Sequence, residues 1–426
     1  MTRPLAIGVD VGTSGIRALA IDDKGAIHAQ ATRSMPAPMG TDGRQEQSPT
    51  IWWDTLLDTL GALTRTLPAD HQPRALALDG TSGSLLLAGR DGRALGPALM
   101  YADQRASTEA AHIAELAPAE SGAHGPSSAL AKLLWLLRHQ PPPPGFRALH
   151  QADWLLACLG APLGTSDENN ALKLGYDPVN RHWPEWLARL GIPPEALPEP
   201  RIPGTPVGTL NPSLAHTLGL PAGLTLVAGT TDGVAAFIAT GANTPGEGVT
   251  SLGSTLVLKQ LCSHPIFQAE AGIYSHRLGD LWLAGGASNS GGAVLRAHFD
   301  DDEIARCTQA LRPEEPTALD YYPLLRPGER FPIADPGLPP RLTPRPADTC
   351  RFFQGMLEGM AEIERQGYVR LREAGGEPLI SVRSVGGGAI NTGWTRIRAA
   401  HLGVPLLDPH HQDAAYGAAL LARRVL

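Results

Sequence analysis

Apolar segments of strand length alternate with apolar segments of helix length in the first part of the chain. The pattern predicts strands at 5–11, 16–21 and 26–32, a helix at 50–67 and a further strand at 74–78. Another helix is expected at 129–138, before four consecutive prolines at 141–144 that cannot continue it. This succession predicts an α/β domain with a mixed sheet.

The first two expected strands are joined by a glycine-rich turn in the stretch GVDVGTSGIRALAID at 8–22. Asp10 ends an otherwise apolar strand, where a carboxylate is costly unless a cation or hydrogen-bond donor meets it. The turn lacks the lysine of a P-loop, and a strand follows where a dinucleotide fingerprint needs a helix. Its amides and the Thr13 and Ser14 hydroxyls can face an anion, with Mg²⁺ bridging Asp10 to phosphate oxygens. A tight hairpin whose amides satisfy Asp10 is the alternative.

A second stretch, GVTSLGSTLVL at 248–258, echoes the opening one: strand, glycine, two hydroxyl residues, strand. The echo predicts two related domains, each presenting such a hairpin to a shared cleft, and a chance match of a short stretch is the alternative. A chain of 426 residues also favours two domains over one. We place the linker in GANTPGEG at 241–248, which gives domains at 1–240 and 241–426.

Asp232 stands where an apolar strand, TLVAGTT at 225–231, meets an apolar helix, and this position fits two roles. The aspartate can be an ordinary N-cap of the helix. It can also be a general base in a cleft, accepting the proton of a substrate hydroxyl during phosphoryl transfer. The segment by itself leaves both open.

Two further turns carry groups that suit small ligands. Three consecutive glycines at 386–388 follow an expected strand and leave room for a flat ring such as adenine, a flexible loop being the alternative. The turn DGTSGS at 79–84 and the stretch YADQR at 101–105 carry polar groups that can hold a polyol. Ordinary turn chemistry would explain either of these polar stretches as well.

Composition narrows the class of protein. Hydrophobic residues make up 42% of the chain, charged residues 18%, and the net charge is −7, which gives no electrostatic case for binding nucleic acid or an anionic membrane. The cysteines at 158, 262, 307 and 350 show no paired spacing, so reduced thiols are expected. No apolar run is long enough to span a bilayer, and we expect a cytoplasmic protein.

Together the motifs resemble the FGGY family of carbohydrate kinases in order and spacing, from about residue 5 to the C-terminus. The resemblance implies two ribonuclease H-like domains of the actin and hexokinase type with a cleft between them, and ATP and Mg²⁺ as cofactors. The stretches that carry it are GVDVGTSGIRALAID, YADQRA, KLLWL, TSDENNALKLGYD, VAGTTDGVAAFIATG, VTSLGSTLVL, LAGGASNSGG, SVGGGAINTGWTRIRAAHLGVPL and DAAYGAALLA.

Family roles carry over to matching positions. Asp232 would be the base that deprotonates the sugar hydroxyl, and Asp10 would hold Mg²⁺ and face the substrate. The remaining residues would contact the nucleotide: Gly12, Thr13 and Ser14 around the transferring phosphate; Gly253, Ser254 and Thr255 as the opposing clamp; Gly386, Gly387, Gly388 and Asn391 around the adenine.

The sugar is indicated by the turn at 80–83. Xylulose kinases of the family usually have Gln-Met-His-Gly where this chain has Gly-Thr-Ser-Gly, which looks like the compact group that phosphorylates D-ribulose. Ser82 would touch the sugar and Asp103 would be a second contact. The expected reaction is phosphorylation of the C5 hydroxyl of a ketopentose, D-ribulose first, with D-xylulose or a pentitol as alternatives.

The sequence leaves four points open. The chain has Ala399-Ala400-His401 where many relatives have Ala-Asp, which puts nucleotide contacts near the C-terminus in doubt. An actin-like ATPase or interaction protein is the alternative from another class, and it predicts ATP turnover indifferent to sugar. A homodimer is neither favoured nor excluded, and the pairs at 52–53 and 410–411 have no assigned role.

Overall fold

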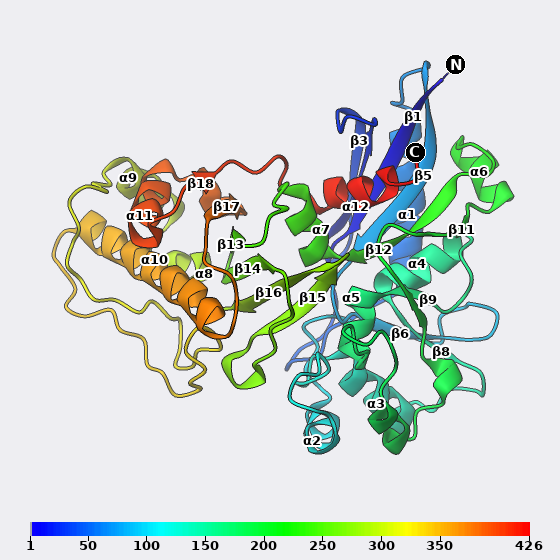
Figure 1. Ribbon diagram of the computed structural model, residues 1–426, viewed down its shortest axis with the longest axis horizontal. Coiled ribbons are helices and arrows are strands. Elements are labelled where there is room, and N and C mark those ends of the chain that lie inside the picture. Colours follow the sequence, from blue (N-terminus) through cyan, green and yellow to red (C-terminus); the bar gives the residue numbers. More distant parts are fainter. Residues whose placement is uncertain (1) are drawn as a thin grey trace. The chain divides into compact units, whose positions relative to one another are not determined.

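The computed structural model describes residues 2–426, which form two compact units (Figure 1). The first unit comprises residues 2–239 and Asp413–Leu426, and the second is Thr240–Gln412. Each unit is built on a six-stranded mixed sheet with helices, so the predicted α/β class is confirmed. The second unit differs from the expected domain 241–426 because the last segment of the chain packs with the first unit.

The first sheet begins with an antiparallel meander and continues with parallel strands. β1, β2 and β3 pair antiparallel in succession, β5 lies parallel to β1, and β12 lies parallel to β5. In spatial order the strands are β11 (Pro206–Thr209), β12 (Thr225–Thr231), β5 (His71–Gly80), β1 (Arg3–Val11), β2 (Gly15–Ile21) and β3 (Ile27–Ser34).

Helices of the first unit cover this sheet and a smaller one. In α1, Trp52, Leu56, Leu60 and Leu63 recur at helical spacing and are fully buried on the side that contacts β2 and β3. The helices of this unit are α1 (Pro49–Thr64), α2 (Ser107–Leu116), α3 (Ala129–His139), α4 (Gln151–Leu159), α5 (Glu168–Ala171), α6 (Pro212–Leu218), α7 (Asp232–Ala239) and α12 (Ala414–Arg423).

Helix α12 closes the first unit with the last residues of the chain, lying beside β1 in Figure 1. It approaches the strand closely: a Cβ on Gly8 would lie 1.9 Å from the Ala415 carbonyl oxygen and 2.2 Å from the Ala419 nitrogen. Glycine in the strand and alanines on the helix therefore allow a contact that larger side chains would block.

The segment between β5 and β12 builds the rest of this unit. A four-stranded sheet has the order β4 (Glu46–Gln47), β7 (Ala98–Leu99), β6 (Leu85–Ala88) and β8 (Arg147–His150), and β9 (Thr165–Asp167) pairs with β10 (Glu199–Arg201). Helix α3 ends at His139, just before the prolines at 141–144, as the sequence predicts.

The second unit repeats the arrangement of the first sheet. β13 and β14 form an antiparallel hairpin, β16 pairs with β14, and β17 lies parallel to β13 as β5 does to β1. The sequence echo therefore corresponds to a structural repeat. In spatial order the strands are β15 (Tyr274–Leu278), β16 (Leu281–Ala287), β14 (Leu256–Cys262), β13 (Glu247–Leu252), β17 (Ser381–Val385) and β18 (Leu406–Leu407).

The helices of the second unit are α8 (Gly292–His298), α9 (Asp301–Gln309), α10 (Thr349–Glu373) and α11 (Thr392–Leu402). α10 packs on α9, α11 and β14. Cys307 on α9 and Cys350 at the start of α10 form a disulfide, so the expectation of reduced thiols is wrong for these two. They stand 43 residues apart, and only the packing of the two helices brings their Cα atoms to 4.8 Å. Cys158 and Cys262 are free thiols.

Within residues 2–426, none of the helices has the length and apolar composition required to cross a membrane.

Candidate functional site

Two carboxyl groups lie side by side at the ends of the central strands of the first unit. Asp10 on β1 is the cross-strand neighbour of Asp79 on β5. Asp79 is 0% exposed, and neither of its oxygens has an N–H or hydroxyl donor among the residues described. A buried acid without a donor, beside a second carboxyl group, is an arrangement that a cation would stabilise.

Burial controls the ionisation of this pair. Burial raises the pKa of Asp10 to about 6, the neighbouring Asp79 acts to lower it, and the negative charges of Asp232 and Asp413 raise it further. Burial also raises the pKa of Asp79 well above its ordinary value, with the charge of Asp10 next in importance. Asp79 is therefore the protonated member, and Asp10 is the carboxylate that a cation can bind.

Asp232 lies near this pair because β12 runs parallel to β5, with Thr230 opposite Asp79. It is the first residue of α7, and its carboxylate accepts a hydrogen bond from the Gly233 N–H at 2.6 Å. Asn169 of α5 donates to the Thr230 hydroxyl at 3.0 Å and so ties this strand end to the helix beside it. The position at a strand end suits a base without excluding a role at the helix start.

Arg17 and Asp413 complete the charges around Asp10. Arg17 is the cross-strand neighbour of Asp10 on β2, and its guanidinium lies 3.0 Å from the Asp413 carboxylate. Asp413 also caps α12 by accepting from the Ala415 N–H at 3.2 Å. The sequence indicated Asp79 only as part of a polar turn that could hold a polyol, not as a partner of Asp10, and it gave no sign of Asp413. Asp79 could have been found, since it ends an apolar strand as Asp10 does.

The turn between β1 and β2 is the expected hairpin. The Gly12 N–H donates to the Gly15 carbonyl at 3.0 Å, and the Met35 N–H donates to the Ser14 carbonyl at 2.8 Å. Ser14 is exposed and Thr13 half-buried, so both hydroxyls lie at the surface end of the sheet. These are positions from which a ligand can be reached.

The donor set beside this hairpin fits Mg²⁺. Over residues 2–426 no group of three His, Cys, Asp or Glu side chains forms a ready-made metal site. Mg²⁺ usually needs no such cage, because it keeps several waters and binds one or two carboxylates plus substrate phosphates. Asp10, ionised beside a buried acid that lacks a donor, is a suitable single ligand.

The predicted sugar contacts differ in their surroundings. Ser82 stands in the turn between β5 and β6, and its Oγ is buried without a partner in the described chain. Asp103 is 0% exposed, and its carboxylate is held by the Arg105 guanidinium at 2.7 Å and the Gln45 N–H at 2.7 Å. The Ser82 hydroxyl therefore makes no hydrogen bond within the described chain, whereas Asp103 would have to share its oxygens with Arg105. Its sugar contact stays a prediction.

In the second unit, several predicted nucleotide residues line one cavity of about 600 Å³. The predicted residues in its wall are Gly253, Ser254, Gly387, Gly388 and Asn391. Thr255 and Gly386 are adjacent in sequence but are not part of the wall. Asn391 caps α11, accepting from the Trp394 N–H at 2.9 Å and donating to the Thr308 hydroxyl at 3.2 Å.

The other side of this cavity was not foreseen. Helix α9 contributes Asp301, Ile304, Ala305 and Thr308, and α10 contributes Phe353 and Leu357. Neither segment has a motif, and their role follows from packing alone. The glycines, the apolar side chains and the polar edge suit a flat, partly polar ring.

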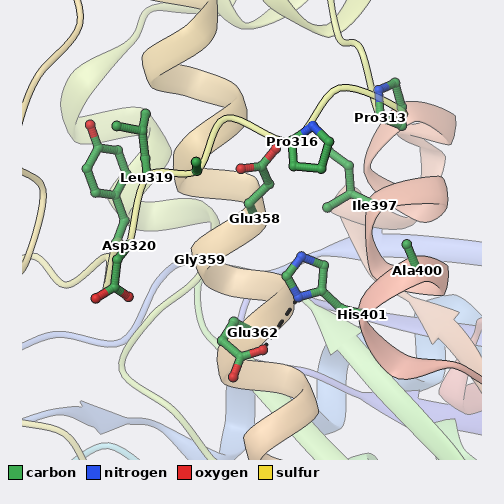
Figure 2. A pocket seen from close by; sticks show the side chains of 12 residues that line it. Pro313, Pro316, Leu319, Asp320, Glu358, Gly359, Glu362, Ile397, Ala400 and His401 are labelled. Carbon is green, nitrogen blue, oxygen red and sulfur yellow. Dashed lines mark ion pairs between the residues drawn. The ribbon is translucent and has the colours of Figure 1, made fainter.

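A second cavity of about 430 Å³ lies in the same unit between α10, α11 and the segment at 313–321 (Figure 2). His401, where the family resemblance fails, faces Glu362 here at 3.5 Å. Hydrogen bonds from the Arg365 guanidinium lower the pKa of Glu362 to about 2, and Glu358 accepts from the Thr317 N–H at 3.1 Å. Since these acids are already paired, we assign this cavity no ligand.

Family models cover almost the whole chain. The N-terminal domain of the FGGY family of carbohydrate kinases matches residues 5–239, and the C-terminal domain of that family matches residues 249–425.

Individual relatives agree with these matches. A xylulose kinase of Staphylococcus epidermidis is 22% identical over 439 residues, covering 99% of this chain and 88% of its own. A xylulose kinase of Bacillus subtilis is 24% identical and covers 98% of this chain and 87% of its own. The crystal structure of a xyloylose kinase from Brucella ovis superposes with a TM-score of 0.89 at 25% identity, covering 98% of this chain and 90% of that one.

Proposed function

Since the chain belongs to the FGGY family of carbohydrate kinases and is an ATP-dependent sugar kinase, we propose that it phosphorylates the C5 hydroxyl of a ketopentose, with D-ribulose as the preferred substrate. One observation carries the choice of sugar. The turn at 80–83 reads Gly-Thr-Ser-Gly, and the Ser82 hydroxyl is buried with no partner in the described chain. A buried hydroxyl without a partner favours a substrate that supplies one.

In the proposed reaction the C5 oxygen attacks the γ-phosphorus of ATP in line. The bond from that phosphorus to the β,γ-bridging oxygen breaks, and ADP leaves with the electron pair. Asp232 accepts the proton of the sugar hydroxyl. Its carboxylate, at the end of β12 beside the Asp10 and Asp79 pair, is supported as the base by this position.

Asp10 is the residue proposed to hold Mg²⁺. A bound Mg²⁺ would supply positive charge to the phosphate oxygens. Asp79 lies beside Asp10 on the neighbouring strand, and Gly12, Thr13 and Ser14 would offer amides and hydroxyls to the transferring phosphate.

The nucleotide is proposed to occupy the cavity of about 600 Å³ in the second unit. Gly387 and Gly388 would lie against the adenine, and Asn391 would form its polar edge. Gly253 and Ser254 would face the phosphates, with Thr255 beside them. The lining of one cavity by residues from two separate motifs supports this placement.

D-xylulose is the second candidate, because the curated relatives named above are xylulose kinases. The Gly-Thr-Ser-Gly turn argues against it, because xylulose kinases usually carry a bulkier Gln-Met-His-Gly turn there. A pentitol such as ribitol or xylitol is a third candidate. The cytoplasmic location expected from the sequence is part of this proposal.

The test is ADP release from Mg·ATP, measured with a coupled optical assay for D-ribulose, D-xylulose, L-ribulose, ribitol, xylitol, glycerol and no sugar. We expect D-ribulose to raise the rate furthest above the blank, and D232N to lose that increment by about 10²- to 10⁴-fold. A higher kcat/KM for another sugar would overturn the D-ribulose assignment. Equal ATP turnover with every sugar and with none would contradict the proposal as a whole.

A further inference from the structure

Among the hydroxyl groups of the turn at 80–84, those of Thr81 and Ser84 are hydrogen-bonded and that of Ser82 is not. Thr81 and Ser84 join their hydroxyls at 2.6 Å, and the Ser84 Oγ also accepts from the Tyr101 N–H at 2.9 Å. The Ser82 Oγ is buried without a partner in the described chain. The fold thus fixes the backbone on both sides of one uncommitted hydroxyl.

Gln151 holds this turn from the opposite side. It is the first residue of α4 and is 0% exposed. Its Oε1 accepts two hydrogen bonds from Thr81, one from the backbone N–H at 3.0 Å and one from the hydroxyl at 2.9 Å. A single side-chain oxygen, 70 residues along the chain, therefore fixes both the backbone and the side chain of the residue before Ser82.

Gly80, which has no side chain, leaves room for the Gln151 side chain to reach Thr81. A Cβ on Gly80 would lie 3.1 Å from the Gln151 Oε1, 3.3 Å from the Ala152 nitrogen and 3.4 Å from the Ala152 Cβ. These distances are tight, so any larger residue would push α4 away from the turn. Gly80 and Gln151 form one fitted pair.

Lys132 of α3 fixes the residue after Ser82. Its Nζ, on a side chain that is 0% exposed, donates to the Gly83 carbonyl at 2.8 Å and to the Tyr101 carbonyl at 3.3 Å. Gln151 and Lys132 thus hold the turn from two different helices. Between them, Ser82 has little freedom to shift its Cα.

The amide nitrogen of Gln151 shows that packing alone does not explain why a glutamine stands at this position. Its Nε2 is buried and lacks an acceptor in the part of the chain that the structure describes. A buried amide donor without a partner costs about 1–3 kcal/mol. An apolar side chain of similar volume would avoid that cost, so the role of the glutamine here lies in the two bonds to Thr81.

We propose that Gln151 is a positioning residue for sugar recognition: it fixes the turn at 80–84 so that the Ser82 hydroxyl meets the substrate in one orientation, and so sets the preference among ketopentose epimers. This rests on the proposed role of Ser82 as a sugar contact. D-Ribulose and D-xylulose differ only in configuration at C3, so a small shift of one hydroxyl can change the preference.

The experiment compares Gln151→Met with Gln260→Met, both close to the original side chain in volume. Gln260 is a matched control, because it is also 0% exposed, donates to the Glu377 carbonyl at 3.0 Å and has a buried oxygen without a partner, but lies in the second unit. KM and kcat are measured for D-ribulose, D-xylulose and ATP in each variant and in S82A. Amide hydrogen exchange of the turn at 80–84 is measured without ligand.

For Q151M we expect KM for the preferred sugar to rise about tenfold and the kcat/KM ratio of the two epimers to fall at least about fivefold. KM for ATP should stay within about twofold, and exchange at 80–84 should quicken. Q260M should leave the sugar parameters and this exchange unchanged. Thr81→Val should give part of the Q151M effect, and the double variant should show less than the sum, because one network is lost.

The outcomes separate this proposal from the one on which it rests. If S82A leaves KM for every sugar unchanged, the sugar contact of Ser82 is wrong and the positioning role fails with it. If S82A raises KM for the sugar while Q151M behaves like Q260M, the sugar contact stands and the positioning role is overturned. Unchanged exchange at 80–84 in Q151M would also overturn it.

Discussion

The two hairpins that open the two sheets have the same topology and different chemistry. β1 and β2 join through Gly12-Thr13-Ser14, and β13 and β14 join through Gly253-Ser254-Thr255. Counting back from each turn, Asp10 corresponds to Ser251. On the neighbouring parallel strand, Asp79 lies opposite Asp10, whereas Val385 lies opposite Ser251.

This comparison of the two hairpins shows which unit carries charged residues at its strand ends. In the first unit the ends of β1, β5 and β12 bear acidic residues, and burial raises the pKa of Asp10 to about 6. In the second unit the corresponding strand ends bear neutral residues, and the glycines after β17 line a cavity with Gly253. In our proposal the acidic strand ends of the first unit serve proton and metal chemistry, and the glycines at 386–388 of the second unit, here called the neutral shelf, hold a ring.

The sharpest test of this comparison is a pair of substitutions at corresponding positions. We expect D10N to lower sugar-dependent kcat/KM by about 10³-fold, roughly 4 kcal/mol, because the proposed cation ligand is lost. S251A should stay within about threefold of the wild type. Steady-state kinetics with saturating Mg²⁺ measure both. Comparable losses in the two variants would show that the hairpins do not differ in role.

The second unit also differs in having a covalent link behind its cavity. Helix α9 lines the cavity, and Cys307 is its one fully buried residue, joined to Cys350 across 43 residues. We expect C307S/C350S to lower the free energy of unfolding of this unit by about 3–4 kcal/mol. Urea unfolding with and without dithiothreitol measures the effect. Cys158→Ser is the control, and an unfolding midpoint insensitive to both reductant and substitution would contradict the prediction.

A smaller effect is expected on stability as a function of pH. Asp10 binds its proton more tightly in the folded chain, where its pKa is about 6, than in the unfolded chain, where it is 3.8. The folded state therefore holds more protons between these values, and stability falls as pH rises through this window. D10N removes this loss, so without ligands the inactive variant should be more stable than the wild type at pH 7.5 by about 2–3 kcal/mol.

Urea unfolding at several pH values from about 4 to 8 measures this difference. The gain should be near zero below about pH 4 and level off above about pH 6. Asp23→Asn, at an exposed position, is the control and should show no such rise. If D10N is less stable than the wild type at pH 7.5, the prediction that the buried Asp10 carboxylate lowers the free energy of unfolding is wrong.

The smallest expected effect concerns the neutral shelf. A Cβ on Gly387 would meet no atom within 4 Å, so G387A should not strain the fold, although the residue lines the cavity. We expect KM for ATP to rise about fivefold, roughly 1 kcal/mol, with KM for the sugar unchanged. Gly61→Ala, on the partly buried side of α1, is the kinetic control. An unchanged KM for ATP would remove the shelf from the proposed nucleotide site.

How much the sequence could predict depends on whether a signal is local. The strand at 5–11, the turn after it and Asp232 at a strand-to-helix junction are readable because each motif lies within a few residues. The echo at 248–258 predicted two related domains that each present a hairpin, and β1–β2 and β13–β14 are both antiparallel hairpins. The family resemblance, carried by the same motifs, is confirmed by the matches to both FGGY domains.

The remainder depends on contacts between distant residues. Asp79 lies beside Asp10 because β5 pairs with β1, and Asp413 belongs to the same unit because residues 413–426 return to it. The bonds from Gln151 to Thr81 span 70 residues, and the disulfide spans 43. No local pattern encodes these pairings, since each depends on how whole helices and strands pack.

The return of α12 to the first sheet has a consequence for how the protein is made on the ribosome. The second unit is one continuous segment, Thr240–Gln412, and its sheet can be completed as soon as that segment has emerged. The first unit must wait for the last residues of the chain, because Ala415, Ala419 and Leu421 cover the apolar face around Ala6 and Val227. During synthesis the earlier-translated unit is therefore the later one to finish folding, and a chain that stops before residue 413 lacks the helix that covers this face.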